Sequence, residues 1–202
     1  MRLYDFLVGL FSLLARLFGV KISGREQVPQ TGPLVVIGNH RCWTDILLMA
    51  LAVYPRHVHF MAKSEYGQNK PLDWLIRHCE CFKVERGEVD VKAIKTALGY
   101  LKKQEVLGIF PEGTRNRTEA PLLPFKEGAF MIAARGKAQV LPLTISHAER
   151  FFKLGRPKAE VRIGAAFSLD AFQNEQGKFD PAQAAAYAGE QIKKMLPNGQ
   201  DF

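Results

Sequence analysis

The chain has 202 residues, of which 47% are hydrophobic and 24% are charged, so it predicts one folded domain with a sizeable core and excludes an intrinsically disordered protein. Its three cysteines give no even disulfide framework, which indicates a reducing compartment. Its net charge of +8 indicates an anionic partner, and the alternatives are nucleic acid, a membrane surface and a phosphorylated ligand.

An apolar segment from Leu3 to Val20 begins the chain. Its polar or small residues recur every three or four positions and predict a narrow polar stripe on a helix: Arg2, Asp5, Gly9, Ser12, Arg16 and Gly19. A helix of this length, about 27 Å, is short for a membrane span, and its charges are costly in a bilayer. We therefore expect residues 1–22 to lie in a membrane interface, ahead of a domain over 23–202. A helix packed across the core is the alternative.

The remaining chain alternates between strand-like and helix-like segments. Apolar or alternating runs predict strands at 34–38, 56–62, 81–84, 106–110, 140–145 and 161–167, after a loop at 24–32. Helical periodicity predicts helices at 44–53, 72–78, 91–103, 130–135 and 181–196. This alternation indicates a single α/β domain.

A histidine and an aspartate follow the first of these buried strands. His40 stands five residues ahead of Asp45, in the turn between the strand at 34–38 and the helix at 44–53. Imidazole exchanges a proton near neutral pH, and a carboxylate can hold the ring in one tautomer. Ligands of open α/β sheets bind beyond the carboxyl ends of the strands, so the pair is a candidate base and orienting group. It lacks a nucleophile of its own.

A second polar segment follows the strand at 106–110. It contains Glu112, Gly113, Thr114 and Arg115. Glycine allows a sharp turn or a close approach to a ligand, and the arginine fork suits phosphate. A polar turn with solvated arginines is the alternative for this segment alone.

Other groups carry weaker signals. Cys42 lies near His40 but does not share its helix face, which disfavours a covalent nucleophile. His57 and His59 share one side of the predicted strand; a metal pair is the alternative, but packing or surface positions are favoured. His78, Cys79 and Cys81 cluster, but they lack a fourth metal ligand at suitable spacing. Basic and aromatic residues do not gather in a nucleic-acid module, so no nucleic-acid partner is expected.

Four motifs in order resemble the glycerolipid acyltransferase family, in its 1-acylglycerol-3-phosphate (lysophosphatidic acid) acyltransferase branch. They are Asn-His-x4-Asp at 39–45, Phe-Pro-Glu-Gly-Thr-Arg at 110–115, Phe-Lys-x-Gly at 125–128 and Val-Leu-Pro-Leu at 140–143. Lys63 and Arg86 fall where the family has similar residues. The resemblance implies a central mixed sheet flanked by helices, as in glycerol-3-phosphate acyltransferase.

The resemblance also implies an activity and roles for these residues. An acyl group would pass from an acyl thioester, acyl-CoA or acyl carrier protein, to the free hydroxyl of a lysophospholipid. His40 would be the base, oriented by Asp45, and the substrate hydroxyl would supply the missing nucleophile. Glu112, Gly113, Thr114 and Arg115 would help bind the acceptor, with Arg86 and Lys63 at its phosphate. No metal or other cofactor is implied.

The resemblance leaves the acceptor open, since Glu85 precedes Arg86 where the family commonly has Asp. Another lysophospholipid or a lyso-amino-acid lipid is an alternative acceptor, and a lipid-binding relative without turnover is an alternative to an enzyme. The expected location is peripheral or monotopic, at the cytoplasmic face of the inner or plasma membrane, on an anionic lipid surface.

Overall fold

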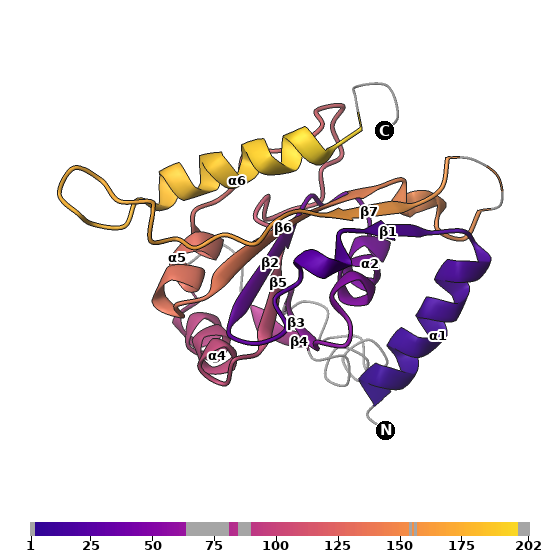
Figure 1. Cartoon of the computed structure of the whole chain (residues 1–202), viewed down its shortest axis with the longest axis horizontal. Helices are drawn as coiled ribbons and strands as arrows, with labels where there is room; N and C mark the ends of the chain where they lie inside the picture. Colours follow the sequence, from indigo (N-terminus) through magenta and orange to yellow (C-terminus); the bar gives the residue numbers. More distant parts are fainter. Residues whose placement is uncertain (1–2, 64–80, 85–89, 154, 156, 198–202) are drawn as a thin grey trace.

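The protein is built around one seven-stranded sheet. A computed structural model describes residues 3–63, 81–84, 90–153, 155 and 157–197. The strands lie in the order β1-β7-β6-β2-β5-β3-β4 (Figure 1). Their bounds are β1 Lys21–Ser23, β2 Leu34–Gly38, β3 Val58–Lys63, β4 Cys81–Val84, β5 Val106–Ile109, β6 Gln139–Ser146 and β7 Glu160–Ile163. β2 and β6, in which almost every residue is buried, lie side by side at the centre of the sheet.

The sheet is mixed, as the resemblance implied. β2 runs parallel to both β5 and β6, and β3 runs parallel to β5 and β4. The single antiparallel pairing among the described strands joins β6 to β7, and β1 pairs in parallel with β7. The carboxyl ends of β2, β5 and β6 therefore meet at one edge of the sheet, and the chain leaves that edge at residues 39, 110 and 147.

Helices cover both faces of the sheet. On one face lie α1 (Leu3–Leu17) and α2 (Thr44–Val53), and on the other lie α4 (Val91–Lys102), α5 (Gly128–Arg135) and α6 (Pro181–Met195) (Figure 1). β2 contributes to the cores on both faces of the sheet. Leu34 and Val36 pack on the side of α1 and α2, whereas Val35 and Ile37 pack on the side of α4, α5 and α6. This alternation explains why the whole strand is apolar.

Most predicted elements are confirmed within two or three residues, and β2, β4 and α2 match their predicted bounds. Two short segments differ from expectation. β1 was not predicted, since residues 21 and 22 were assigned to the first helical segment, and the predicted strand at 161–167 ends at Ile163. Beyond it, Phe167 makes an isolated bridge with Val140. The predicted loop at 24–32 contains a short 3-10 helix, η1 (Arg25–Gln27), and the predicted helix at 72–78 lies outside the described residues.

The first helix carries two apolar faces. Its buried face packs in the core through Tyr4, Val8, Phe11 and Ala15. Four other apolar side chains are 46–71% exposed, and their spacing places them along a second face: Phe6, Leu10, Leu13 and Leu17. The expected polar stripe is only partly toward water, because Asp5 contacts His57 at 2.8 Å. Within the described residues, no helix has the length and apolarity needed to cross a membrane.

Candidate active site

The candidate site lies where β2 and β5 end side by side. His40 follows β2 by two residues, and Glu112 follows β5 by three. Because the strands are parallel and in register, these two segments leave the sheet together. Topology thus brings together the two motifs that the sequence places 72 residues apart.

His40 and Asp45 form the predicted pair. The ring Nδ1 of His40 lies 2.9 Å from Oδ2 of Asp45, whose side chain is 2% exposed. The same carboxylate oxygen accepts the backbone N–H groups of Arg41 and Cys42 at 2.6 and 2.8 Å. These two backbone donors hold the Asp45 carboxylate in position independently of its contact with His40. With Nδ1–H donating to Asp45, Nε2 keeps the lone pair that a general base needs.

The loop after β5 holds the backbone of His40 on both sides. The His40 N–H donates to Oε1 of Glu112 at 2.7 Å, and the His40 carbonyl accepts the N–H of Asn116 at 2.6 Å. The ring of His40 stacks on Phe110, with centroids 4.1 Å apart and planes 15° apart. Ring position, backbone position and tautomer are therefore each set by a separate contact.

Glu112 joins two loops. Its Oε2 accepts the N–H of Leu123 at 3.0 Å, so both carboxylate oxygens are used by backbone donors, and the residue is 3% exposed. Burial raises the pKa of Glu112 above its usual 4.5, although the N–H donors from His40 and Leu123 oppose the rise. The sequence pointed to Glu112 as an acceptor-binding residue, which stays a prediction. The contact of Glu112 with the His40 backbone was missed.

Asn39, the residue before His40, links β2 to β6. Its amide nitrogen donates to the carbonyl of Ile145, and its amide oxygen accepts the N–H of Ile145, both at 2.8 Å. This two-bond contact continues the β2–β6 ladder past Gly38 through a side chain. It anchors the residue next to His40, and the sequence motif included Asn39 without indicating this role.

Gly113 makes the turn that leads to the arginine. Its φ of +71° favours glycine, and a Cβ there would lie 2.8 Å from Nζ of Lys126. Lys126 of the third motif thus lies over this turn, and its backbone N–H donates to Pro111. Thr114 is exposed and Arg115 is half-buried next to the turn. The motif at 125–128 included Lys126 without indicating that its amine lies at this turn.

Of two further predicted phosphate-binding residues, the structure describes the backbone of Lys63 and does not describe Arg86. The backbone of Lys63 ends β3 and pairs with Val84 of β4, at the same edge of the sheet as His40. Arg86 lies outside the described residues, as do His78 and Cys79. Their roles stay predictions.

Cys42 does not have the properties of a nucleophile. Burial, and after it the nearby Asp45 carboxylate, raise the pKa of its thiol from 9.0 to about 11. Sγ lies 2.8 Å from Oγ1 of Thr44. A thiol with a raised pKa is almost entirely protonated at neutral pH, so it is a poor nucleophile.

The expectation that His57 and His59 share one side of a strand is wrong, because β3 begins only at Val58. His57 contacts Asp5 of α1, whereas His59 contacts Glu105 and stacks on a ring of α4. In the part of the chain that the structure describes, no group of three or more His, Cys, Asp or Glu side chains is arranged to hold a metal.

Comparison with known proteins agrees with this arrangement. The chain is 33% identical over 180 residues to 1-acyl-sn-glycerol-3-phosphate acyltransferase of Bacillus subtilis, covering 88% of each protein. It is 34% identical over 121 residues to the enzyme of the same name from Streptococcus pneumoniae, covering 59% of this chain and 44% of that one.

A solved structure shares the fold. It is the crystal structure of PlsC, the 1-acyl-sn-glycerophosphate (LPA) acyltransferase of Thermotoga maritima, with a TM-score of 0.70 and 24% identity. The alignment covers 95% of this chain and 79% of that one. The model of the Acyltransferase family matches residues 19–146, which hold His40, Asp45 and the turn at Gly113. The chain therefore belongs to the acyltransferase family and is an acyltransferase.

Proposed function

We propose that this protein moves a fatty acyl group from an acyl thioester to the free hydroxyl of 1-acylglycerol-3-phosphate, forming phosphatidic acid for phospholipid synthesis. The relatives from B. subtilis and S. pneumoniae carry this acceptor in their names. The observation that carries the proposal is the Nδ1 contact of His40 with Asp45, which directs the basic Nε2 away from the aspartate. The donor is acyl-CoA or acyl carrier protein.

The chemistry needs a base because an alcohol is a weak nucleophile at neutral pH. Nε2 of His40 takes the proton of the acceptor hydroxyl while the hydroxyl oxygen attacks the thioester carbonyl carbon. Asp45 stabilises the imidazolium that forms. When the tetrahedral intermediate collapses, the carbon–sulfur bond breaks and His40 returns the proton to the thiolate. The new ester bond between the acyl carbon and the acceptor oxygen remains.

The acceptor phosphate needs cations close to this base. Arg115 follows the Gly113 turn, and its planar guanidinium suits two phosphate oxygens. Thr114 adjoins it, and Arg86 and Lys63 are proposed to complete the phosphate site. Holding the phosphate would fix the distance from the acceptor hydroxyl to His40, and this positioning accounts for a large part of many enzymatic rate enhancements.

Release of the CoA thiol tests the reaction. With 1-acylglycerol-3-phosphate and acyl-CoA, the wild type should release thiol, and His40→Ala should be slower by about 10²–10⁴-fold. His57→Ala is the matched control, because it removes a histidine–carboxylate contact elsewhere. Full activity of His40→Ala, or no thiol release with any lysolipid, would contradict the proposal. A panel of other lysophospholipids and a lyso-amino-acid lipid tests the choice of acceptor.

The acceptor resides in a bilayer, and we propose that α1 lies peripherally on the cytoplasmic face of an inner or plasma membrane. The exposed apolar face of α1 supports this location. Aromatic rings extend it toward the active site, since the half-buried Phe18 contacts the exposed Phe152, which stacks with the exposed Trp43, three residues from His40. The net charge of +8 suits an anionic lipid surface.

Vesicle partition tests this location. Leu10→Glu with Leu13→Glu should lower binding to anionic vesicles, because both side chains are exposed on α1. The matched control is Met131→Glu with Tyr187→Glu, which changes two exposed apolar residues of α5 and α6 on the other face of the sheet. Equal losses in the two variants would contradict the assignment of α1. Substitution is preferable to removal of residues 1–20, because Tyr4 and Phe11 belong to the core.

A further inference from the structure

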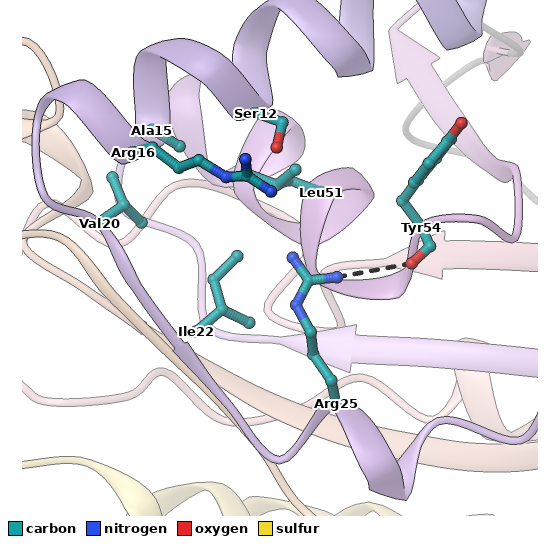
Figure 2. Close-up of a pocket in the computed structure, with 8 residues that line it drawn as sticks. All are labelled: Ser12, Ala15, Arg16, Val20, Ile22, Arg25, Leu51 and Tyr54. Atoms are coloured by element: carbon teal, nitrogen blue, oxygen red, sulfur yellow. Dashed lines mark hydrogen bonds between the residues drawn. The ribbon is translucent and has the colours of Figure 1, made fainter.

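A pocket lies on the α1 side of the molecule. It is bounded by α1, by β1 and η1, and by the end of α2, and it has a volume of about 460 Å³ (Figure 2). Its lining comprises Ser12, Ala15, Arg16, Val20, Ile22, Arg25, Leu51 and Tyr54. None of these residues belongs to the four motifs, so the acyl-transfer reaction does not account for the pocket.

Two guanidinium groups converge on this pocket. Arg16 extends from the last turn of α1 and Arg25 from η1, and Figure 2 shows their head groups directed toward each other across the space. Arg25 donates to the carbonyl of Tyr54 at the long distance of 3.5 Å. Within the described residues, the side chain of Arg16 has neither a hydrogen bond nor an ion pair, and the eight lining residues contain no carboxylate.

This arrangement leaves two like charges uncompensated. The pKa of Arg25 is held below its usual value, first by burial and then by the positive charge of Arg16. Both effects disfavour the charged form of Arg25. An anion between the two guanidiniums would reverse the second effect and would use donors that match its oxygens.

The apolar walls of the pocket limit the kinds of anion that can fit between the two arginines. Ala15 and Leu51 are buried and Val20 and Ile22 half-buried, so the space between the arginines and the core is apolar. Ser12 adds a hydroxyl on the same side as Arg16. A phosphate with a short apolar portion matches these surfaces better than a fully hydrated inorganic anion does.

We propose that this pocket binds a phosphate group between Arg16 and Arg25, at a site separate from the one around His40. Along α2, Leu51 lies six residues beyond Asp45, about 9 Å at the helical rise. The ligand would join α1 to η1, and so hold the first helix against the body. The phosphate can come from an anionic lipid headgroup or from solution.

Thermal unfolding in inorganic phosphate, at constant ionic strength, tests the site. The variants are built on Arg115→Gln, so that a phosphate in the proposed active site does not contribute. We expect phosphate to raise the unfolding temperature of this parent, as ligands of the folded state do, and Arg16→Gln to weaken the apparent phosphate affinity at least about tenfold. Arg135→Gln, which removes an exposed charge at the end of α5, is the control.

The phosphate-free measurement separates binding from structure. Without phosphate, Arg16→Gln should unfold at the same temperature as its parent or higher, because it removes like-charge repulsion from Arg25. If instead Arg16→Gln responds to phosphate as strongly as Arg135→Gln does, the proposal is overturned. A lower unfolding temperature without phosphate, with no change in the phosphate response, would also overturn it and give Arg16 a structural role.

Vesicles identify the source of the phosphate. Phosphatidylcholine vesicles with and without phosphatidylglycerol are compared for the parent, Arg16→Gln and Arg135→Gln. A larger loss of the phosphatidylglycerol-dependent binding in Arg16→Gln supports a lipid headgroup. An equal loss in both variants, together with a weakened response to inorganic phosphate in Arg16→Gln alone, supports a phosphate ligand from solution. Neither result depends on acyl transfer, so the two proposals fail separately.

Discussion

Three histidine–carboxylate contacts of nearly equal length differ in the ring nitrogen that they use. His57 contacts Asp5 at 2.8 Å and His59 contacts Glu105 at 2.9 Å, both through Nε2. His40 contacts Asp45 at 2.9 Å through Nδ1. A carboxylate at Nε2 occupies the far end of the side chain. A carboxylate at Nδ1 leaves the far nitrogen to reach a substrate. Among these three contacts, the ring nitrogen used, rather than the distance, separates the orienting contact from the packing contacts.

The surroundings of the rings differ in the same direction. His59 is 4% exposed near the start of β3 and stacks on Tyr100 at 3.8 Å. His40 stands at the opposite edge, where the parallel strands end and where ligands bind in open α/β sheets. Its ring also stacks on an aromatic residue, Phe110, so stacking alone does not distinguish the two roles.

Replacement of Asp45 should produce the largest difference between these contacts. Asp45→Asn keeps one carbonyl oxygen but removes the charge that stabilises the imidazolium, and its amide can favour the wrong tautomer of His40. We expect kcat/KM for thiol release to fall by about 10²–10⁴-fold. Asp5→Asn, at the His57 contact, should change it less than about twofold. Comparable losses in the two variants would show that the choice of ring nitrogen is irrelevant.

Replacement of Glu112 should have an intermediate effect, on stability as well as activity. Glu112→Gln replaces one of the two acceptor oxygens with an amide NH2 group, a donor that faces the backbone N–H of either His40 or Leu123. An unsatisfied buried donor costs about 1–3 kcal/mol in the free energy of unfolding, which urea titration measures. Glu105→Gln, whose side chain is 39% exposed, is the control and should lose less. Equal losses would remove the special position of Glu112.

The pH dependence of this variant follows from the raised pKa of Glu112. In the folded protein the carboxyl holds its proton to higher pH than in the unfolded chain. The stabilisation from this group is therefore complete below the unfolded value of 4.5 and is lost as the pH rises through the folded pKa. Glutamine does not titrate, so the stability gap between wild type and Glu112→Gln should narrow as the pH rises above 4.5. A widening gap would contradict this sign.

The sequence was sufficient where the determining contacts are local. Leu34–Gly38 is predictable as a strand because a short run of apolar residues can be buried on both faces. His40 and Asp45 are predictable as a pair because both lie in one strand–helix turn. β1 was not predictable, since its three residues Lys21–Ser23 are partly polar and pair with a strand almost 140 residues away.

The supporting contacts of the site were missed for the same reason. Asn39 bonds Ile145, 106 residues later, and Glu112 bonds the His40 backbone, 72 residues earlier. Neither contact leaves a periodic signal, because each depends on which strands become neighbours. The motifs indicated that these residues matter but could not indicate whether they face the substrate or another backbone.

Replacement of Cys42 should have the smallest effect, although it lies only two residues from His40. Its thiol contacts Thr44 and, at 3.4 Å, Oδ1 of Asp45, so it belongs to the surroundings of the carboxylate. Cys42→Ala should therefore retain kcat/KM within about threefold, as expected for a residue that neither binds nor attacks the thioester. Loss of activity by several orders of magnitude would instead support a covalent mechanism.

Alkylation of the thiol gives the matching pH test. The pKa of Cys42 lies at about 11 in place of the usual 9.0, and the thiolate fraction falls tenfold for each unit by which a pKa rises. At pH 8, iodoacetamide should label Cys42 about 100-fold more slowly in the folded protein than in urea, as followed by peptide mass spectrometry. The folded rate should still be rising at pH 10. A rate that levels off near pH 7 would mean that the imidazole, rather than the Asp45 carboxylate, controls this thiol, and the His40–Asp45 contact would then not be the dominant interaction of the site.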